Sequence, residues 1–568
     1  MAKRSEIKHL LTEAGEKLCG NEWDVYPRPT LVRDSFFSLN GEWDLLDSFG
    51  KNVKITVPYP PESILSGVGR SMGKQPILTY SRKFTLPKGF VKDRVILHFG
   101  AADQLTAVRL NGILVGTHTG GYEHFSFDIT DALKDGENRI IVTVMDNLCT
   151  KHLPYGKQSN NRGGMWYTPI SGIWQTVWIE SVPENYVRLL SAVAGKNNVL
   201  IIAAGVQEGE ITIKTPNGYK HAKLNTGMCI VHFDDPVTWS PENPYLYRFT
   251  LKAGEDTVSS YFAFRDISIG EVDGTPRILL NGKPYFFHGV LDQGYYSDGI
   301  YLPATPAEYV RDIKRMKALG FNTLRKHIKL EPELFYYYCD KLGMIVFQDM
   351  INNGDYSFLR DTLLPTLGLK RLNDKNLHKS EICRKHFRES MQNVALTLRC
   401  HPSVCYYTIF NEGWGQFCSD ELYDEMKEWY SYGQIIDSTS GWFYGEKSDV
   451  DSLHVYFRPV RIKPSTRPII LSEFGGYSYK PRGHVANEKR TYGYGFYKSR
   501  RALEDAIAGL YENEIIPQIE KGLCGAIYTQ LSDVEDETNG LISYDRKVVK
   551  VSARRMRAIA ERLKIKEK

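Results

Sequence analysis

Along the first third of the chain, apolar and polar residues alternate in short runs separated by turn residues. Between about residue 30 and residue 183 these runs include "RVILHFGA", "NRIIVTVMD" and "GIWQTVWIE". The alternation predicts β-strands with one buried face. Asn111-Gly112, between two apolar runs, predicts a hairpin turn because both residues tolerate a positive φ. We therefore expect residues 1–183 to form an N-terminal β jelly-roll sandwich that resembles a sugar-binding domain.

The next segment keeps the strand pattern over a shorter length. Residues 184–270 contain runs such as "NVLIIAAGV", "GEITIKT" and "YLYRFTLKA". About seven short strands in fewer than about 90 residues are typical of an immunoglobulin-like β-sandwich. A second all-β domain is therefore expected here.

From residue 271 to residue 568, strand-like runs alternate with helical ones. "PYFFHGVLD" precedes "PAEYVRDIKRMKALG", "FNTLRKHI" precedes "EPELFYYYCDKLG", and "SVCYYTIFNE" precedes "SDELYDEMKEWYSYG". Further candidate strands lie near "GWFYG", "SLHVYF", "IILSEFGG" and "GAIYTQLSD". Eight such units favour a catalytic (β/α)8 TIM barrel. Gly320, Gly343 and Gly522 are expected to end helices that precede strands, and the role of the insertion at residues 352–379 stays open.

Composition and charge narrow the functional classes. The 568 residues carry a net charge of +5 and 24% charged residues, which is ordinary for a globular protein. No basic block precedes the terminal "KIKEK", so we expect no nucleic-acid partner. The nine cysteines include no CxxC pair, which favours free thiols in a reducing compartment. Without a secretory leader or a long apolar run, the sequence predicts a cytoplasmic protein that does not contact a membrane.

Two glutamates stand where barrel strands end. Glu412 follows the apolar run "VCYYTIF" and Asn411, and Glu473 closes "PIILSE". In such a barrel the active site lies at the carboxyl ends of the strands, and the fourth and seventh strands face each other. Two facing carboxyl groups suit glycoside hydrolysis, in which one protonates the leaving oxygen and the other attacks or stabilises the anomeric carbon. The alternative is a structural role for each glutamate, as one partner of an ion pair or as a helix-capping residue.

Several motifs, in order, resemble those of the family 2 glycoside hydrolases, the group of β-galactosidases, β-glucuronidases and β-mannosidases. They are "NGILVGTHTGGYEHFSFDIT", "SGIWQTVWIE", "NGKPYFFHGV", "FNTLRKH", "FNEGWGQ" and "LSEFGG". The resemblance covers nearly the whole chain and implies a retaining exo-β-glycosidase with Glu473 as nucleophile and Glu412 as acid/base. It implies a carbohydrate substrate and no cofactor. Some relatives bind Mg²⁺ and Na⁺ near the site, but we assign no metal ligand here, and a homo-oligomer stays open.

The resemblance also names residues that would surround these glutamates. Asn411 would donate to the sugar 2-hydroxyl, with a turn cap as the alternative. His327 would contact sugar hydroxyls, or else serve as a core histidine. Arg325 lies on the same strand face as His327 and would keep Glu473 ionised, with a plain structural ion pair as the alternative.

Further candidates for sugar contact come from motifs that match the family and from positions that depart from it. Tyr456 matches a tyrosine near the nucleophile, and His454 shares its strand face. Trp414 either stacks on a sugar or packs in the interior. Where lactose-cleaving members carry an Arg-His-Glu run, this chain has "LDQGYYSDG". Asp292 and Gln293 are therefore candidates to bind the sugar hydroxyls in place of that run.

The end of the barrel departs from the glucuronidase pattern. Glucuronidases hold the sugar carboxylate with an Asn-x-Lys pair, and this chain has Glu537 and Asn539 about there, within "DVEDETNGLISYDRK". Asp533, Glu535 and Asp536 add negative charge in the sequence nearby. This pattern favours Glu537 as a residue that binds neutral sugar hydroxyls, and the alternative is that the segment forms a solvated loop. It predicts a β-D-galactoside substrate, with α-L-arabinopyranoside as a side activity.

Other functions remain to be distinguished. A β-glucuronidase or an α-L-arabinosidase of the same family is the main alternative, and a β-glucuronidase would need a cation from Lys326, Lys329 or an arginine in residues 352–379. A non-catalytic carbohydrate-binding protein would not need both glutamates in intact motifs. A metal-dependent hydrolase would need a ligand motif such as HExxH, which the 14 histidines do not form.

Overall fold

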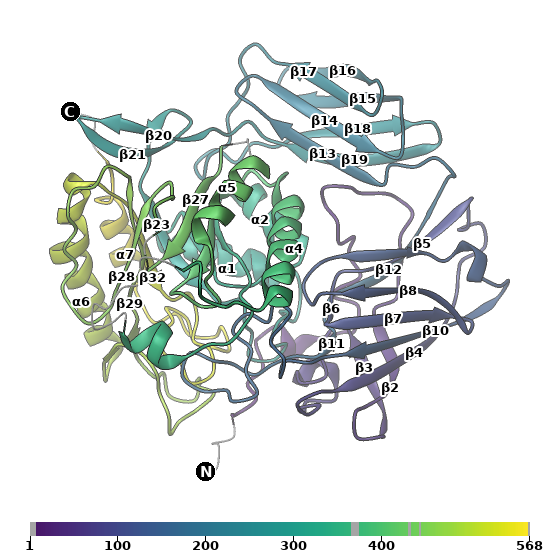
Figure 1. Ribbon diagram of the computed structural model, residues 1–568, viewed down its shortest axis with the longest axis horizontal. Helices are drawn as coiled ribbons and strands as arrows, with labels where there is room; N and C mark the ends of the chain where they lie inside the picture. The colour runs from purple at the N-terminus through teal and green to yellow at the C-terminus, as the bar shows by residue number, and fades with distance from the viewer. Residues whose placement is uncertain (1–6, 365–373, 430–432, 442, 444, 566–568) are drawn as a thin grey trace.

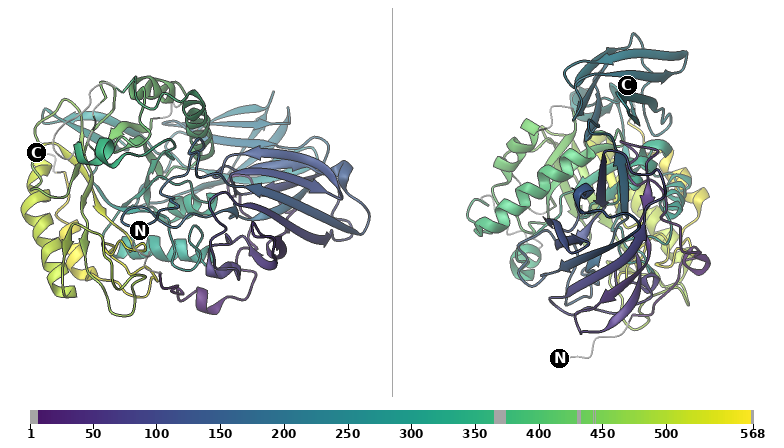
Figure 2. Two further views of the ribbon diagram at one scale, coloured as in Figure 1. Left: turned by 60° about the horizontal axis from the view of Figure 1, so that its bottom comes forward. Right: turned by 90° about the vertical axis from the view of Figure 1, so that its right-hand side faces the viewer.

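The computed structural model describes residues 7–364, 374–429, 433–441, 443 and 445–565 (Figure 1). Two β-sandwiches, coloured purple to teal, pack against a barrel whose colour runs from teal through green to yellow. Figure 2 shows the same arrangement from two further sides. The predicted order of jelly-roll sandwich, immunoglobulin-like sandwich and TIM barrel is confirmed.

The first sandwich consists of a four-stranded sheet, β1-β12-β5-β9, and a six-stranded sheet, β3-β2-β4-β10-β7-β8. Alternate residues of the strands point into a shared core, as in β10, where Ile140, Val142 and Val144 are buried. The predicted hairpin joins β7 to β8, with φ of 52° at Asn111 and 89° at Gly112. The strands are β1 Phe37–Ser38, β2 Gly41–Leu46, β3 Asn52–Val57, β4 Ile77–Thr85, β5 Arg94–Phe99, β6 Ala102–Asp103, β7 Leu105–Leu110, β8 Ile113–Thr119, β9 Phe125–Asp128, β10 Glu137–Met145, β11 Gly172–Ile173 and β12 Val177–Val182.

The second sandwich pairs a three-stranded sheet, β13-β14-β17, with a four-stranded sheet, β16-β15-β18-β19. A small antiparallel sheet, β20-β21-β22, then leads into the barrel. The strands are β13 Leu189–Ala194, β14 Asn198–Ala204, β15 Gly209–Thr215, β16 Gly218–Leu224, β17 Met228–His232, β18 Tyr247–Ala253, β19 Asp256–Phe262, β20 Ile267–Val272, β21 Thr275–Leu280 and β22 Lys283–Pro284.

Eight strands form the parallel barrel in the order β27-β26-β25-β24-β23-β32-β29-β28. Between β27 and β28, side-chain hydrogen bonds run from Ser440 Oγ to His454 Nε2 (3.0 Å) and from Ser452 Oγ to the Thr439 carbonyl (3.1 Å). The barrel is therefore nearly closed, and the carboxyl ends of its strands converge. The strands are β23 Phe287–Asp292, β24 Thr323–Lys326, β25 Ile345–Asp349, β26 Val404–Asn411, β27 Ile435–Ser440, β28 Asp451–Val455, β29 Ile469–Gly475 and β32 Leu523–Thr529.

The fifth barrel strand differs from its prediction. We predicted it near residues 441–445, but the strand is β27, Ile435–Ser440. Its sequence, "IIDSTS", has few apolar residues, and the polar ones are buried by pairing: the Tyr406 hydroxyl donates to Asp437 Oδ2 at 2.9 Å. Trp442 and Tyr444 lie outside the described residues.

The helices follow the predicted alternation. The three glycines expected at helix ends have positive φ, 91° at Gly320, 71° at Gly343 and 110° at Gly522, as a left-handed helix end requires. Residues 365–373 of the insertion lie outside the described residues. No described helix has the length and apolar character needed to cross a membrane. The helices are α1 Ala307–Ala318, α2 Glu333–Leu342, α4 Glu381–Leu398, α5 Ser419–Trp429, α6 Arg500–Leu510 and α7 Ala553–Ala560.

Candidate active site

Glu412 and Glu473 lie beside each other at the carboxyl end of the barrel. A carboxylate oxygen of Glu412 and one of Glu473 are within 4.8 Å of each other. Both side chains are largely buried, with 9% and 5% of the residue exposed. Carboxyl groups about 5 Å apart fit a retaining glycosidase, whereas an inverting enzyme separates them by roughly 6.5–9.5 Å to admit a water molecule.

The backbone at Glu412 explains how its side chain leaves the strand. Glu412 follows directly on β26 and has a φ of 52°, in the left-handed region that residues other than glycine seldom adopt. Two hydrogen bonds hold this turn, from Glu412 N to the Ser440 carbonyl and from Trp414 N to the Asn411 carbonyl, each 2.9 Å long. Such strain costs about 1–3 kcal/mol and is concentrated at functional sites. The fold therefore maintains a strained conformation at this glutamate.

Glu473 lies among hydrogen-bond donors. Arg325 Nη1 donates to its Oε1 at 3.0 Å, and the Tyr456 hydroxyl donates to its Oε2. Burial alone would raise the pKa of Glu473, but His454 and Arg325, together with the other groups that favour the anion, outweigh burial and lower it. Glu473 is therefore ionised at neutral pH, as a carboxylate nucleophile must be.

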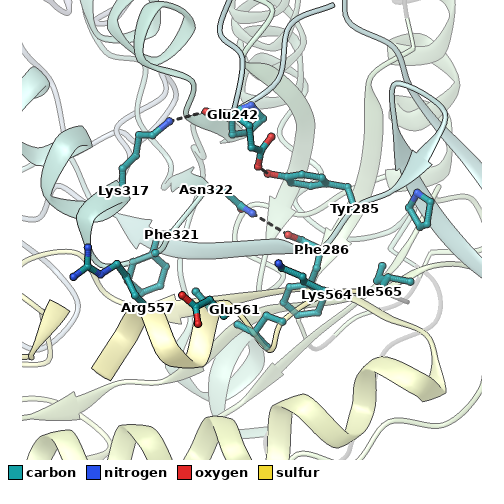
Figure 3. A pocket seen from close by; sticks show the side chains of 15 residues that line it. Glu242, Tyr285, Phe286, Lys317, Phe321, Asn322, Arg557, Glu561, Lys564 and Ile565 are labelled. Carbon is teal, nitrogen blue, oxygen red and sulfur yellow. Dashed lines mark hydrogen bonds between the residues drawn. The ribbon is translucent and has the colours of Figure 1, made fainter. Parts of the chain in front are cut away.

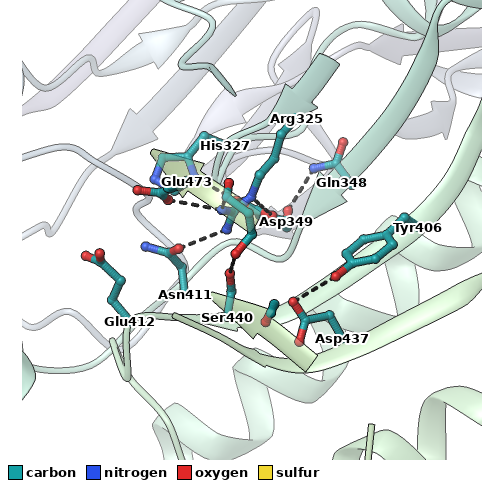
Figure 4. Close-up of polar contacts among 12 residues, drawn as sticks. Arg325, His327, Gln348, Asp349, Tyr406, Asn411, Glu412, Asp437, Ser440 and Glu473 are labelled. Atoms are coloured by element: carbon teal, nitrogen blue, oxygen red, sulfur yellow. Dashed lines mark hydrogen bonds and ion pairs between the residues drawn. The ribbon is translucent and has the colours of Figure 1, made fainter. Parts of the chain in front are cut away.

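Arg325 organises the surroundings of Glu473 (Figure 4). Its guanidinium is 1% exposed and also donates to Asp349 Oδ1 (3.0 Å), the Ser472 carbonyl (3.0 Å) and Asn411 Oδ1 (2.9 Å). Because Asn411 accepts through Oδ1, its Nδ2 points elsewhere, and among the described residues this amide nitrogen has no hydrogen-bond partner. Asn411 is thus oriented to donate to a ligand.

His454 connects the two glutamates. Its Nδ1 lies 2.8 Å from Glu412 Oε1 and 3.5 Å from Glu473 Oε2, and its Nε2 lies 3.0 Å from Ser440 Oγ. This geometry suits orienting the carboxyl groups, and the sugar contact that we predicted for His454 stays a prediction. Within the described part of the chain, these three residues are also the only group of possible metal ligands close enough to share an ion.

His327 and Trp414 lie next to this centre. His327 Nδ1 is 2.6 Å from Asp349 Oδ2, and burial, with the charge of Lys157 next, lowers the pKa of this histidine. Its Nε2 has no hydrogen-bond partner among the described residues, so it remains free for a sugar hydroxyl. Trp414 is 1% exposed and stacks on Trp166 at 5.2 Å between ring centroids. Its burial favours packing over sugar stacking.

Asp292 and Gln293 lie at the end of β23, and the described contacts do not connect them to the two glutamates. Asp292 Oδ2 accepts from Lys326 Nζ at 2.6 Å, and its Oδ1 accepts from Gly294 N at 2.9 Å. Its carboxylate therefore has partners already. Gln293 is buried, and its Oε1 has no hydrogen-bond partner among the described residues.

Glu537 occupies the predicted position near the end of the barrel. Its Oε2 accepts from the Tyr167 hydroxyl at 2.9 Å and from Gln530 Nε2 at 2.7 Å. Burial raises the pKa of Glu537 to about 7, although Lys157 and the hydrogen bond from Tyr167 oppose the shift. The charge of Glu473 adds to the upward shift, which places the two glutamates within electrostatic reach of each other.

The other acids of this segment do not add free negative charge, contrary to our expectation. Lys550 Nζ is 2.5 Å from Asp533 Oδ1, and Arg162 Nη1 is 3.4 Å from Glu535 Oε2 and 3.6 Å from Asp536 Oδ1. Arg162 comes from the first domain, so a count of charges along this segment could not reveal the pairing. These ion pairs leave less negative charge in this segment to repel an anionic sugar.

The cations that we considered for an anionic sugar have other partners. Lys326 and Lys329 both bind Glu331 Oε1 at 2.9 Å. Arg360 pairs with Asp361 at 2.5 Å, and Arg371 lies outside the described residues.

Sequence reasoning missed the contribution of the first domain. The Lys157 ammonium lies 4.4 Å from the centroid of the Trp414 ring, and Tyr167 reaches Glu537. Both residues belong to the segment between β10 and β11, residues 146–171, which contains no strand. Long connections without regular structure are often functional, and this length was the available signal. Tyr492 and Tyr494, after β29, also lie within electrostatic reach of Glu412 and Glu537.

A separate cavity lies at the opposite end of the barrel. It has a volume of about 690 Å³ and is lined by residues that precede β23 and β24, together with residues of α7 and the chain after it (Figure 3). Its polar groups pair locally, as in the hydrogen bond from the Tyr285 hydroxyl to Glu242 at 2.8 Å. This end of a TIM barrel serves stability rather than catalysis, so Glu412 and Glu473 remain the candidate active site.

Family models match almost the whole chain. The sugar-binding domain of glycosyl hydrolases family 2 matches residues 26–183, a second model of the family matches residues 192–265, and the TIM barrel domain matches residues 271–565. The chain belongs to glycosyl hydrolase family 2.

Relatives carry two different names. A β-galactosidase from Thermoanaerobacter pseudethanolicus is 24% identical over 375 residues, which cover 61% of this chain and 46% of that protein. A β-glucuronidase from Felis catus is 24% identical over 447 residues, which cover 68% of this chain and 65% of that protein. The chain thus spans about half to two thirds of the length of these curated relatives.

Solved structures share the fold. The β-glucuronidase from Bifidobacterium dentium complexed with coumarin-3-O-glucuronide superposes with a TM-score of 0.72 at 18% identity, covering 95% of this chain and 98% of that one. A β-galacturonidase from Eisenbergiella tayi bound to galacturonate gives a TM-score of 0.65 at 18% identity, covering 95% and 99%. At this identity the likeness describes the architecture only.

Proposed function

We propose that the protein hydrolyses terminal non-reducing β-glycosides with retention of configuration. Glu473 attacks the anomeric carbon while Glu412 protonates the leaving oxygen, and Glu412 then deprotonates the water that cleaves the glycosyl-enzyme. The observation that carries the proposal is the separation of at most 4.8 Å between carboxylate oxygens of Glu412 and Glu473.

The surroundings support this division of roles. Arg325 and Tyr456 donate hydrogen bonds to Glu473 and stabilise its anion. The one hydrogen bond described for the Glu412 carboxylate is its contact with His454. Asn411 Nδ2 is free to donate to the sugar 2-hydroxyl, an interaction that strengthens in the transition state. Binding that grows in the transition state raises kcat.

For the sugar we propose a neutral hexose, with β-D-galactosides as the main substrates and α-L-arabinopyranosides as a side activity. Glu537 supports this choice because a carboxylate accepts hydrogen bonds from hydroxyls and disfavours a second carboxylate beside it. A β-D-glucuronide is the second candidate, favoured by the ammonium of Lys157, which stands near Glu537 and can compensate an anionic sugar.

A panel of nitrophenyl glycosides tests the choice of sugar. We expect kcat/KM for the β-D-galactoside to exceed that for the β-D-glucuronide by at least about 10-fold, a modest ratio because a cation lies near Glu537. The α-L-arabinopyranoside should rank between them. A glucuronide that is cleaved as fast as the galactoside, or faster, contradicts the neutral-sugar proposal.

The pH profile should report the ionisation of Glu537. Because its pKa is raised to about 7, Glu537 is protonated below that pH and ionised above it. If the ionised form accepts a hydrogen bond from the sugar, kcat/KM for the galactoside rises as pH increases through about 7. Glu537→Gln should lose this rise while keeping its contacts to Tyr167 and Gln530. An unchanged rise in the variant assigns it to another group.

A further inference from the structure

Lys157 brings an ammonium group into the active site without a partner. The residue is 6% exposed, and among the described residues its Nζ makes no hydrogen bond and no ion pair. Its nearest described contact is the ring of Trp414, 4.4 Å away. Burial lowers the pKa of Lys157, while nearby carboxylates, Glu537 before Glu473 and Glu412, oppose the shift. The Nζ atom itself keeps access to solvent, so a sugar hydroxyl can take the place of water as its hydrogen-bond partner.

The loop that carries Lys157 is anchored to the barrel. The Lys157 carbonyl accepts from Tyr167 N at 3.0 Å, and the Tyr155 hydroxyl donates to the Gly354 carbonyl at 2.9 Å. Gly156 has a φ of 65°, and a Cβ there would lie 2.8 Å from the carbonyl oxygen of Ile328. The backbone beside Lys157 therefore lies against the barrel, so the segment that carries the ammonium is held at the site before any ligand binds.

We propose that Lys157 is a specificity-determining residue of the sugar site: it donates hydrogen bonds to a ring hydroxyl of the terminal sugar, and Glu537 accepts from a neighbouring hydroxyl. The inference rests on the proposed glycosidase function and deepens it. An ammonium group can only donate and a carboxylate can only accept. The two groups lie within electrostatic reach but form no ion pair within 4.0 Å, which leaves their hydrogen-bonding capacity available to hydroxyls.

The charge balance favours a hydroxyl over a sugar carboxylate as the partner. Three glutamates, Glu412, Glu473 and Glu537, already act on Lys157. A sugar carboxylate would add a fourth acid to a largely buried site and would compete with Glu537 for the same cation. A hydroxyl satisfies the ammonium without adding charge.

The test compares Lys157→Met with the matched control Lys151→Met. Methionine keeps the length and apolar packing of the side chain on Trp414. Lys151 belongs to the same loop, but its side chain is 34% exposed and its closest acid, Asp355, is 3.8 Å away. We expect Lys157→Met to lower kcat/KM for nitrophenyl β-D-galactoside on the order of 10- to 100-fold and Lys151→Met to change it less than about 2-fold. The thermal midpoint of Lys157→Met should not fall, because no ion pair is lost.

Monodeoxy galactosides identify the hydroxyl. For one deoxy position, wild type and Lys157→Met should be cleaved with kcat/KM values within about 2-fold of each other, because the partner of the ammonium is already absent. A loss that is equal for the parent and every deoxy analogue overturns the proposal, as does a fall in the thermal midpoint with unchanged kinetics. A loss confined to nitrophenyl β-D-glucuronide also overturns it, since Lys157 would then bind a carboxylate. Wild-type protein that cleaves no glycoside contradicts the proposed function itself.

Discussion

Glu473→Gln is expected to reduce kcat/KM for every glycoside that the wild type cleaves by at least about 10⁴-fold. The amide cannot form the glycosyl ester, and among the described residues near the anomeric position only Glu412 offers another carboxylate in the same cluster. The fold should persist, because a glutamine oxygen can still accept from Arg325 and Tyr456. Steady-state rates with nitrophenyl substrates, together with the thermal midpoint, measure both effects.

A matched control separates loss of the nucleophile from loss of any buried carboxylate. Glu308 on α1 is 1% exposed, its carboxylate lies 3.4 Å from Arg311, and none of the charged groups described around it is Glu412 or Glu473. Glu308→Gln should keep activity within about 3-fold of wild type. Activity of Glu473→Gln above about 1% of wild type would contradict the assignment of the nucleophile.

Glu412→Ala should have an effect that depends on the leaving group. A phenyl glycoside has a poor leaving group that needs a proton on departure, so its first step should slow by about 10²–10⁴-fold. A dinitrophenyl glycoside leaves without that proton, and its first step should slow far less. Pre-steady-state kinetics on the two substrates measures the difference.

The cavity left by the Glu412 side chain provides a second readout. Azide can enter it and attack the glycosyl-enzyme without a general base, so turnover should recover and the product should be a β-glycosyl azide. His454 loses its 2.8 Å contact in this variant, and His454→Asn serves as the control: it should affect good and poor leaving groups alike. Equal losses for both leaving groups in Glu412→Ala would show that Glu412 is not the acid.

The barrel and its two glutamates were predictable because local pattern and topology agree. Each glutamate directly follows or closes an apolar run, and glycines come soon after, so each was placed at the carboxyl end of a strand where barrel enzymes carry catalytic groups. Periodicity failed for β27, because the burial of Asp437 depends on the Tyr406 hydroxyl. Tyr406 lies on the neighbouring strand, so the pattern of apolar residues within β27 gives no sign of this hydrogen bond.

The surroundings of Glu537 could not be predicted for a similar reason. Arg162 and Lys157 come from the first domain, more than 370 residues earlier in the chain, and the sequence does not say which loop of that domain meets the barrel. Charge counted along the local segment therefore suggested an acidic cluster, whereas the fold pairs Glu535 with Arg162 and places Lys157 near Glu537. Contacts between domains decide the electrostatics of this site.

The proposed mechanism requires Glu473 to form a covalent bond to the sugar, and trapping the glycosyl-enzyme would detect that bond. A 2-deoxy-2-fluoro glycoside of the best substrate with a dinitrophenyl leaving group should accumulate as an ester on the wild-type protein, because the fluorine slows breakdown of the intermediate. Peptide mass spectrometry should then find one sugar per chain, on the peptide that contains "PIILSEFGGY" and at Glu473. A label on Glu412 or on any other residue, or release of a product with inverted configuration, would contradict the account.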